Sequence, residues 1–117
     1  MIQGVHHVAI ISSSKESVKF YEKLGFKPFF ERERQNDTVI LLYGHGIQIE
    51  IFIDPSHPPY AAAPENIGLR HIALKVDNIE KTAEDLELTI GDIKKDWTGI
   101  RFAYTKDPDG LSVELHE

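Results

Sequence analysis

The chain has 117 residues, 41% of them hydrophobic and 27% charged, which is typical of one soluble globular domain. Its formal net charge of −6 and its scattered lysines and arginines disfavour a nucleic-acid surface, because phosphate binding needs a basic face. The absence of cysteine excludes disulfides and thiolate metal sites. No apolar stretch reaches membrane-spanning length and no signal peptide is evident, so we expect a cytoplasmic protein without membrane contact.

The first half of the chain predicts one strand, one helix and three further strands. A β-branched, apolar strand is expected over residues 5–11. Ser13 and Glu16 fit a capping box at the start of a helix that runs to about Leu24. Three strand-like stretches follow, separated by turn residues, over residues 27–33, 38–43 and 47–53.

The same order of elements recurs after a proline-rich linker over residues 54–67. A strand is expected over 69–76, and Asp77 begins a cap for a helix that buries Ile79, Ala83, Leu86 and Ile90. The last strands are expected over residues 92–97, 100–105 and 111–116. Each half therefore predicts a β-α-β-β-β module, module one over residues 1–53 and module two over residues 68–117.

The two halves also align residue by residue. His7 and His71 lie 64 residues apart, and further identical pairs share this offset, among them Gly4 and Gly68, Ala9 and Ala73, Glu16 and Glu80, Gly46 and Gly110, Glu50 and Glu114. Each half thus carries a histidine followed 43 residues later by a glutamate. A long period that occurs only twice indicates a duplicated module and not a solenoid.

Strand alternation predicts that these four side chains line one surface. Around Glu50, the odd positions from 47 to 53 are all isoleucine, and Gln48, Glu50 and Phe52 lie on the opposite face. The other strands divide in the same way, and the aliphatic faces should pack on the amphipathic helices. His7 lies opposite Val8 and matches His71, whereas the adjacent His6 falls on the aliphatic face. We therefore expect a cleft face that carries one His or Glu on each of four strands.

Two histidines and two carboxylates suit a divalent ion such as Zn, Ni, Co, Mn or Fe(II). A single strand His or Glu is more often solvated or hydrogen-bonded, but four at matched offsets and on matched faces favour one shared metal site. We expect Phe52 inside the cleft and His116, which has no repeat partner, near its rim. His45 in a turn and His57 in the linker are expected to be exposed.

With these motifs the sequence resembles the vicinal oxygen chelate superfamily, which includes glyoxalase I, methylmalonyl-CoA epimerase, extradiol dioxygenases and bleomycin-resistance proteins. The motifs that carry the resemblance are His6-His7-Val8-Ala9-Ile10, Phe20-Tyr21, Leu24-Gly25-Phe26, Ile49-Glu50-Ile51, Gly68-Leu69-Arg70-His71-Ile72-Ala73-Leu74, Asp107-Pro108-Asp109-Gly110 and Val113-Glu114-Leu115.

The resemblance implies a single α+β domain over residues 1–117. Its two modules would form an open eight-stranded, cup-shaped sheet with the helices packed on its outer face and one metal ion per site. By position, His7, Glu50, His71 and Glu114 match the metal ligands of the superfamily. The resemblance also implies a homodimer, with sites formed within one chain or across two, and a small-molecule substrate.

The ligand set resembles that of bacterial glyoxalase I, a lyase that isomerises the hemithioacetal of methylglyoxal and glutathione. That enzyme places an arginine four residues after the first histidine and an asparagine four after the first glutamate, where they help to hold glutathione. Ile11 and Asp54 occupy these positions here, which counts against glutathione and leaves any thiol of the substrate open.

These features predict a glyoxalase I-like, divalent-metal-dependent lyase or isomerase. It would abstract a proton next to a carbonyl and stabilise the resulting enediolate, with Glu114 or Glu50 as the general base. One alternative is an Fe- or Mn-dependent dioxygenase or a metal-dependent antibiotic-modifying enzyme. Another is a non-catalytic resistance module that binds a small molecule.

Overall fold

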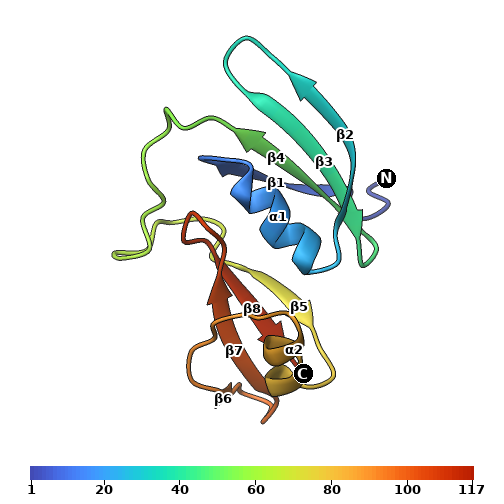
Figure 1. Ribbon diagram of the computed structural model, residues 1–117. Helices are drawn as coiled ribbons and strands as arrows, with labels where there is room; N and C mark the ends of the chain where they lie inside the picture. The colour runs from blue at the N-terminus through green and yellow to red at the C-terminus, as the bar shows by residue number, and fades with distance from the viewer. The chain divides into compact units, whose positions relative to one another are not determined.

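The computed structural model describes all 117 residues and divides into two compact units, Met1–Pro58 and Pro59–Glu117 (Figure 1). The division falls inside the predicted linker of residues 54–67. Each unit contains one helix and one four-stranded sheet, so the α+β class with two β-α-β-β-β modules is confirmed. The union of the two sheets in one cup within a single domain stays a prediction.

The first module forms a sheet in the order β1-β4-β3-β2, in which β1 runs parallel to β4 and the other neighbours are antiparallel. This register places Ala9 of β1 beside Glu50 of β4, and His7 beside Gln48. The elements of this module are β1 (His7–Ser12), α1 (Glu16–Lys23), β2 (Lys27–Glu33), β3 (Thr38–Gly44) and β4 (Ile47–Ile53).

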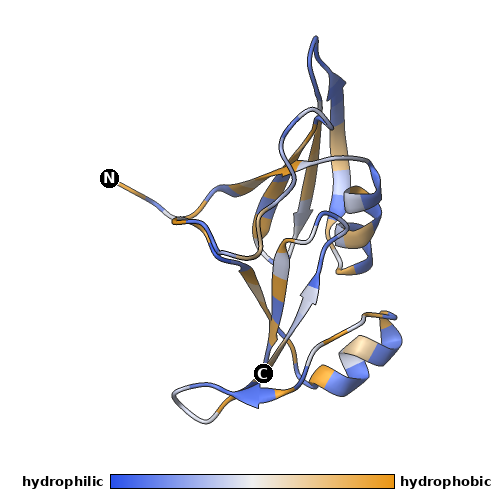
Figure 2. Cartoon of the chain, turned by 90° about the vertical axis from the view of Figure 1, so that its left-hand side faces the viewer, coloured by the Kyte–Doolittle hydropathy of each residue, from blue (hydrophilic) through white to orange (hydrophobic).

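One face of this sheet is buried and the other is open. The residues that alternate along β1, β3 and β4 and form the core are Ile10, Ile40, Leu42, Ile49 and Ile51. Val18 and Tyr21 of α1 are buried with them, and Figure 2 shows this amphipathic helix beside the apolar strands of its sheet. Of the four isoleucines on one face of β4, Ile49 and Ile51 thus pack in the core, because a strand presents alternate residues to each side, while Ile47 and Ile53 at its ends are half-buried.

The start of α1 differs from the predicted capping box. The helix begins at Glu16 with Lys15 as its N-cap, two residues after Ser13, and Lys15 makes no side-chain cap hydrogen bond. A turn centred on Ser14 accounts for the later start, since its carbonyl accepts hydrogen bonds from the Ser12 hydroxyl and from both the amide and the hydroxyl of Ser17.

The hairpin between β3 and β4 also closes the end of α1. His45 and Gly46 form its two-residue loop with φ angles of 51° and 79°, the left-handed geometry of a type I′ turn. The His45 Nε2 atom lies 2.8 Å from the Leu24 carbonyl oxygen, and its ring packs edge-on against Phe26. His45 is exposed as predicted, but its ring satisfies a carbonyl at the C-terminus of the helix.

The second module repeats this topology in the order β5-β8-β7-β6, with β5 parallel to β8. Its core is the cluster of Ile79, Ala103 and Leu115, against which Val76, Leu88, Ile90 and Ile93 pack. Its elements are β5 (Ile72–Lys75), α2 (Ile79–Asp85), β6 (Lys94–Lys95), β7 (Arg101–Lys106) and β8 (Ser112–His116).

Several elements of this module are shorter than predicted. The helix ends at Asp85 and does not reach Ile90, because Glu87 adopts a φ of 52° and redirects the chain. Ile90 still packs on the core, but from an irregular segment. β6 keeps only two residues of the predicted 92–97, and β5 begins after His71, which precedes its first residue.

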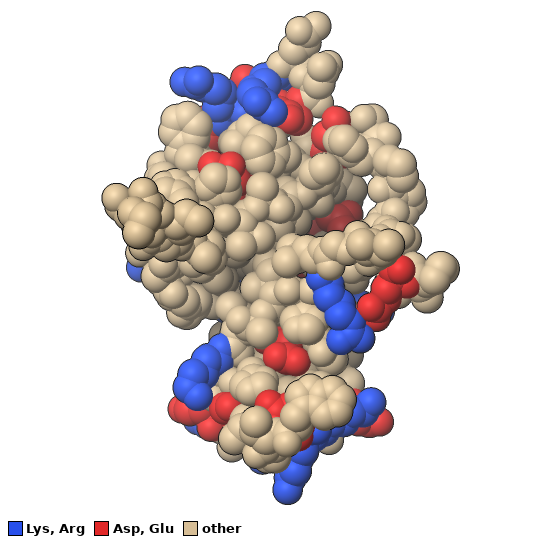
Figure 3. Space-filling view, turned by 180° about the vertical axis from the view of Figure 1, so that it is seen from behind, with Lys and Arg blue, Asp and Glu red and all other residues tan.

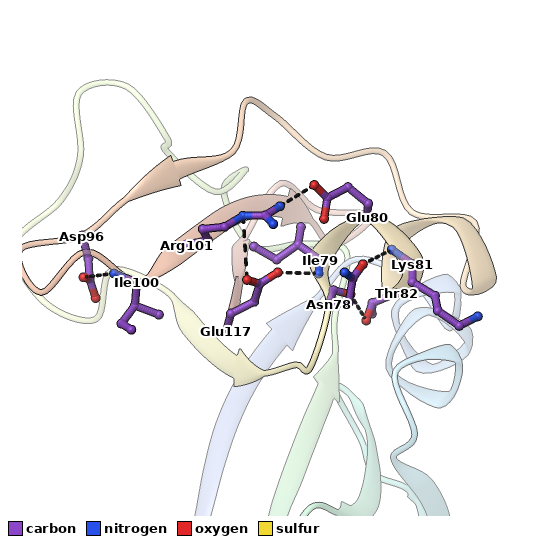
Figure 4. Close-up of polar contacts among 9 residues, drawn as sticks. All are labelled: Asn78, Ile79, Glu80, Lys81, Thr82, Asp96, Ile100, Arg101 and Glu117. Atoms are coloured by element: carbon purple, nitrogen blue, oxygen red, sulfur yellow. Dashed lines mark hydrogen bonds and ion pairs between the residues drawn. The ribbon is translucent and has the colours of Figure 1, made fainter.

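Polar contacts fix the N-terminus of α2 (Figure 4). The N-cap is Asn78 and not Asp77, and its Oδ1 atom accepts a 2.7 Å hydrogen bond from the Lys81 amide. The Glu117 carboxylate accepts a 3.0 Å hydrogen bond from the Ile79 amide. Arg101 of β7 contacts both Glu80 and Glu117, and so ties the sheet to the start of the helix.

No helix of this chain has the length and apolar character needed to cross a membrane. Lysines and arginines are interspersed with aspartates and glutamates on the face shown in Figure 3 and do not gather into one basic patch.

We predict that Asn78→Ala lowers the free energy of unfolding by about 1 kcal/mol, because the Lys81 amide loses its cap. Lys15→Ala is the matched control, since Lys15 holds the N-cap position of α1 without a side-chain cap bond. It should cost less than about half as much, through its exposed ion pair with Glu31. Urea denaturation of both variants measures the difference, and equal losses would contradict the role of Asn78.

Candidate functional site

The first predicted pair comes together on the open face of the module-one sheet. His7 Nε2 lies 3.4 Å from Glu50 Oε2, and the two side chains are 39% and 21% exposed. The other Glu50 oxygen accepts a 3.2 Å hydrogen bond from the Gln48 amide nitrogen, two residues earlier on β4. The Nδ1 atoms of His6 and His7 lie 2.9 Å apart, so His6 contacts the back of the His7 ring while His7 faces Glu50.

The second pair occupies the equivalent place in module two. His71 Nε2 lies 3.9 Å from Glu114 Oε1, and the side chains are 23% and 13% exposed. Ala73 is the β-ladder partner of Glu114, as Ala9 is of Glu50. The Nδ1 atom of His71 is buried and has no hydrogen-bond partner, which makes this imidazole an unsatisfied donor or acceptor.

Glu114 also belongs to a chain of polar contacts that Glu50 lacks. Its Oε2 atom lies 3.3 Å from His116 Nδ1, and His116 Nε2 lies 3.4 Å from Asp96 Oδ2. The second Asp96 oxygen accepts hydrogen bonds from the Thr98 amide and hydroxyl and from the Ile100 amide. The Ile100 amide first, and then the Thr98 hydroxyl, lower the pKa of Asp96 by stabilising its charged form.

Tyr104 of β7 borders the same carboxylate. It is the β-ladder partner of Glu114, and its ring centroid lies 5.3 Å from that of His71 in an edge-on arrangement. Burial first, and then the charge of Glu114 and a hydrogen bond to it, raise the pKa of Tyr104, while the nearby Arg70 opposes this shift. The phenol therefore stays protonated at neutral pH and can donate to Glu114.

The surroundings of Glu50 are more apolar. Leu41 of β3 is its ladder partner, and Phe52 is the next residue of β4 on the same face. The Arg34 guanidinium lies 5.4 Å from the centroid of the Phe52 ring and forms a bidentate pair with Asp37. The two glutamates thus share a position in the fold but not an environment.

In each module, the spacing of the histidine and the glutamate suits two neighbouring ligands of a divalent cation. Nitrogen and oxygen ligands about 2.1 Å from a tetrahedral ion lie about 3.4 Å apart. The His7–Glu50 distance of 3.4 Å equals this spacing, and the His71–Glu114 distance of 3.9 Å is close to it. Neither module brings together by itself three His, Asp or Glu side chains that could hold an ion.

The structure places all four predicted ligands as two pairs, His7 with Glu50 and His71 with Glu114. It adds to the second pair His116, which contacts Glu114 and was expected near the rim, and also Tyr104 and Asp96. The position of His116 two residues after Glu114 on one strand was a usable signal. No sequence pattern indicated Asp96, because its contact depends on the path of the loop after β6.

Comparison with known proteins gives a consistent result over nearly the whole chain. Residues 4–115 match the family described as Glyoxalase/Bleomycin resistance protein/Dioxygenase superfamily. The chain is 36% identical to YwkD of Bacillus subtilis (strain 168), an uncharacterized protein, over 100% of this chain and 98% of that one. It is 35% identical to the uncharacterized protein YaeR of Escherichia coli (strain K12), over 99% and 97% of the two chains.

Among solved structures, the glyoxalase family protein from Enterococcus faecalis superposes with a TM-score of 0.89 at 36% identity, covering 98% of each chain.

The surroundings of Tyr104 give a testable pKa. We predict that Glu114→Gln lowers the pKa of Tyr104, because the substitution removes the negative charge that opposes phenolate formation. NMR of tyrosine labelled at Cζ follows the titration, and Tyr104→Phe assigns the signal. Glu50→Gln is the matched control and should leave this pKa unchanged. An unaltered Tyr104 titration in Glu114→Gln would contradict the contact.

Proposed function

Because this chain belongs to the Glyoxalase/Bleomycin resistance protein/Dioxygenase superfamily, we propose that it is a divalent-metal-dependent lyase or isomerase of the glyoxalase I-like type. The observation that carries the proposal is the pair of His–Glu contacts, one in each module, at a spacing suited to shared ligands. His7, Glu50, His71 and Glu114 would hold one ion of Ni, Co, Zn, Mn or Fe. The modules that meet at one ion belong to one chain or to two chains of a homodimer.

A cation held by these four residues would supply positive charge that stabilises the negative charge developing on the substrate. The chain itself supplies the base. Glu114 or Glu50 takes the proton from a carbon next to a carbonyl, and the carboxylic acid that results returns it to the adjacent carbon. The C–H bond breaks, an O–H bond forms on the glutamate, and the return of the proton completes an isomerisation without any oxidant.

The contacts of Glu114 suit it to this exchange. His116 lies near one of its oxygens and His71 near the other, and the protonated Tyr104 phenol donates beside them. These groups fix the direction of the carboxylate, and a base must lie within hydrogen-bond reach of the proton it removes. Glu50 is held by the Gln48 amide and by His7, and its apolar neighbours are Leu41 and Phe52.

We predict that chelator-treated protein binds one Ni(II), Co(II), Zn(II) or Mn(II) ion per site in a calorimetric titration. His7→Ala and Glu50→Ala should each weaken binding by at least about a hundredfold, because each removes a ligand. His6→Ala is the matched control, since His6 touches His7 but not Glu50. It should weaken binding by far less.

Failure of the wild-type protein to bind any of these ions would contradict the metalloenzyme. The chain would then be a module that binds a small molecule without metal. Loss of binding in His6→Ala with retention in His7→Ala would move the ligand to His6.

We further predict that Glu114→Gln or Glu50→Gln lowers the rate of proton exchange by about 100-fold to 10,000-fold, since the amide cannot accept the proton. Hemithioacetals of methylglyoxal with small thiols, and acyl thioesters, are the substrates to screen. Their C–H exchange in deuterated water is followed by NMR, with metal content measured for each variant. Full turnover in both variants would contradict a glutamate base, and oxygen-dependent turnover would instead indicate a dioxygenase.

A further inference from the structure

The open face of the module-one sheet carries a row of side chains next to Glu50. The β-ladder register aligns one residue from each strand in this row: Ile11 of β1, Phe52 of β4, Val39 of β3 and Arg32 of β2. The neighbouring row contains Ala9, Glu50, Leu41 and Phe30. An apolar floor therefore extends from the candidate base across β3 to the edge strand β2, whose seven residues are all exposed.

The contacts of its neighbours show which face Arg32 occupies. Glu31 lies 3.3 Å from Lys15, which precedes α1 on the helix-covered side of the sheet. Since successive strand residues point to opposite faces, Arg32 lies on the open side. Its guanidinium lies 5.5 Å from the centroid of the Phe30 ring, a cation–π distance that directs it toward the row of Glu50.

Arg32 also differs from the other arginine above this floor. Arg34 lies over Phe52, but both of its bonded nitrogens are taken by the Asp37 carboxylate. Arg32 forms no ion pair, and its contact is an aromatic ring. An arginine that is held over an aromatic ring and lacks a carboxylate partner keeps its bidentate donors free for an external oxyanion.

We propose that Arg32 binds a carboxylate of the substrate, whose apolar body lies across Leu41, Val39 and Phe52 toward Glu50. The substrate class is an acyl or aryl carboxylate in which the charged end lies about 10 Å from the reacting carbon, since β2 is two strand spacings from β4. The inference rests on the proposed function for the position of the reacting carbon. The Arg32 subsite itself does not require a metal.

Octanoate and its neutral analogue octanamide provide the test. Both are titrated into the full-length, isotope-labelled protein in the presence of a chelator, so that the carboxylate has no metal to bind, and NMR shifts give Kd. We expect octanoate to bind about fivefold more tightly than octanamide. Arg32→Met should abolish this preference while it leaves octanamide binding unchanged, because methionine keeps an apolar stem and loses the charge.

Lys15→Met is the matched control, since it removes one positive charge from the opposite side of the same sheet. It should keep the preference for octanoate. An equal Kd for octanoate and octanamide in the wild type, or a preference that survives in Arg32→Met, would overturn the inference. Metal titration separates the two proposals. A preference for octanoate that depends on Arg32, in a protein that binds no metal, would support this subsite and contradict the lyase. Metal binding without that preference would support the lyase and contradict the subsite.

Discussion

The pairing of the first strand with the last strand in each module is the constraint on which the candidate site depends. Because β1 is parallel to β4, Ala9 aligns with Glu50. His7 lies two residues before Ala9 and therefore on the same face of the sheet. The pairing of β5 with β8 sets Ala73 beside Glu114 in the same way. A shift of one residue in either register would turn the glutamate toward the helix-covered core. Burial of the aliphatic face of each strand thus fixes the register, and the register fixes the position of the charged side chain on the opposite face.

The two modules use one backbone arrangement for different chemistry. Around Glu114, the neighbouring groups are polar. His116 connects this carboxylate to Asp96, and Tyr104 is its ladder partner on β7. Around Glu50, the corresponding places hold Phe52 and Leu41, with Gln48 as the polar contact. Duplication explains the shared fold, and divergence of the neighbours gives one carboxylate a hydrogen-bonded setting and the other an apolar one. This asymmetry suits a site in which one glutamate exchanges a proton and the other borders the substrate.

Much of this arrangement could be predicted because it depends on alternation, which a sequence displays directly. The isoleucines at odd positions from 47 to 53 identify the core face of β4. Because the two modules repeat, the equivalent residues of β8 are expected to face the same way. Features that depend on exact backbone angles could not be predicted. The cap at Asn78 and not Asp77, and the early end of α2 at Asp85, follow from local turns. The contact between His116 and Asp96 joins a strand to a loop, and the periodicity of the sequence does not predict contacts of this kind.

The position of the unpaired arginine bears on the shape of the substrate. Ile11 stands where the resemblance to glyoxalase I leads one to expect an arginine, and Ile11 and Arg32 lie at opposite ends of one cross-strand row. Three strand spacings, about 14 Å, separate these ends. A ligand anchored by a cation on β1 would extend from Glu50 toward β1, whereas one anchored at Arg32 extends across β3 toward β2. Ile11 supplies no cation at one end of this row and Arg32 supplies an unpaired one at the other, which agrees with the direction proposed for the ligand, from Glu50 across β3 toward β2.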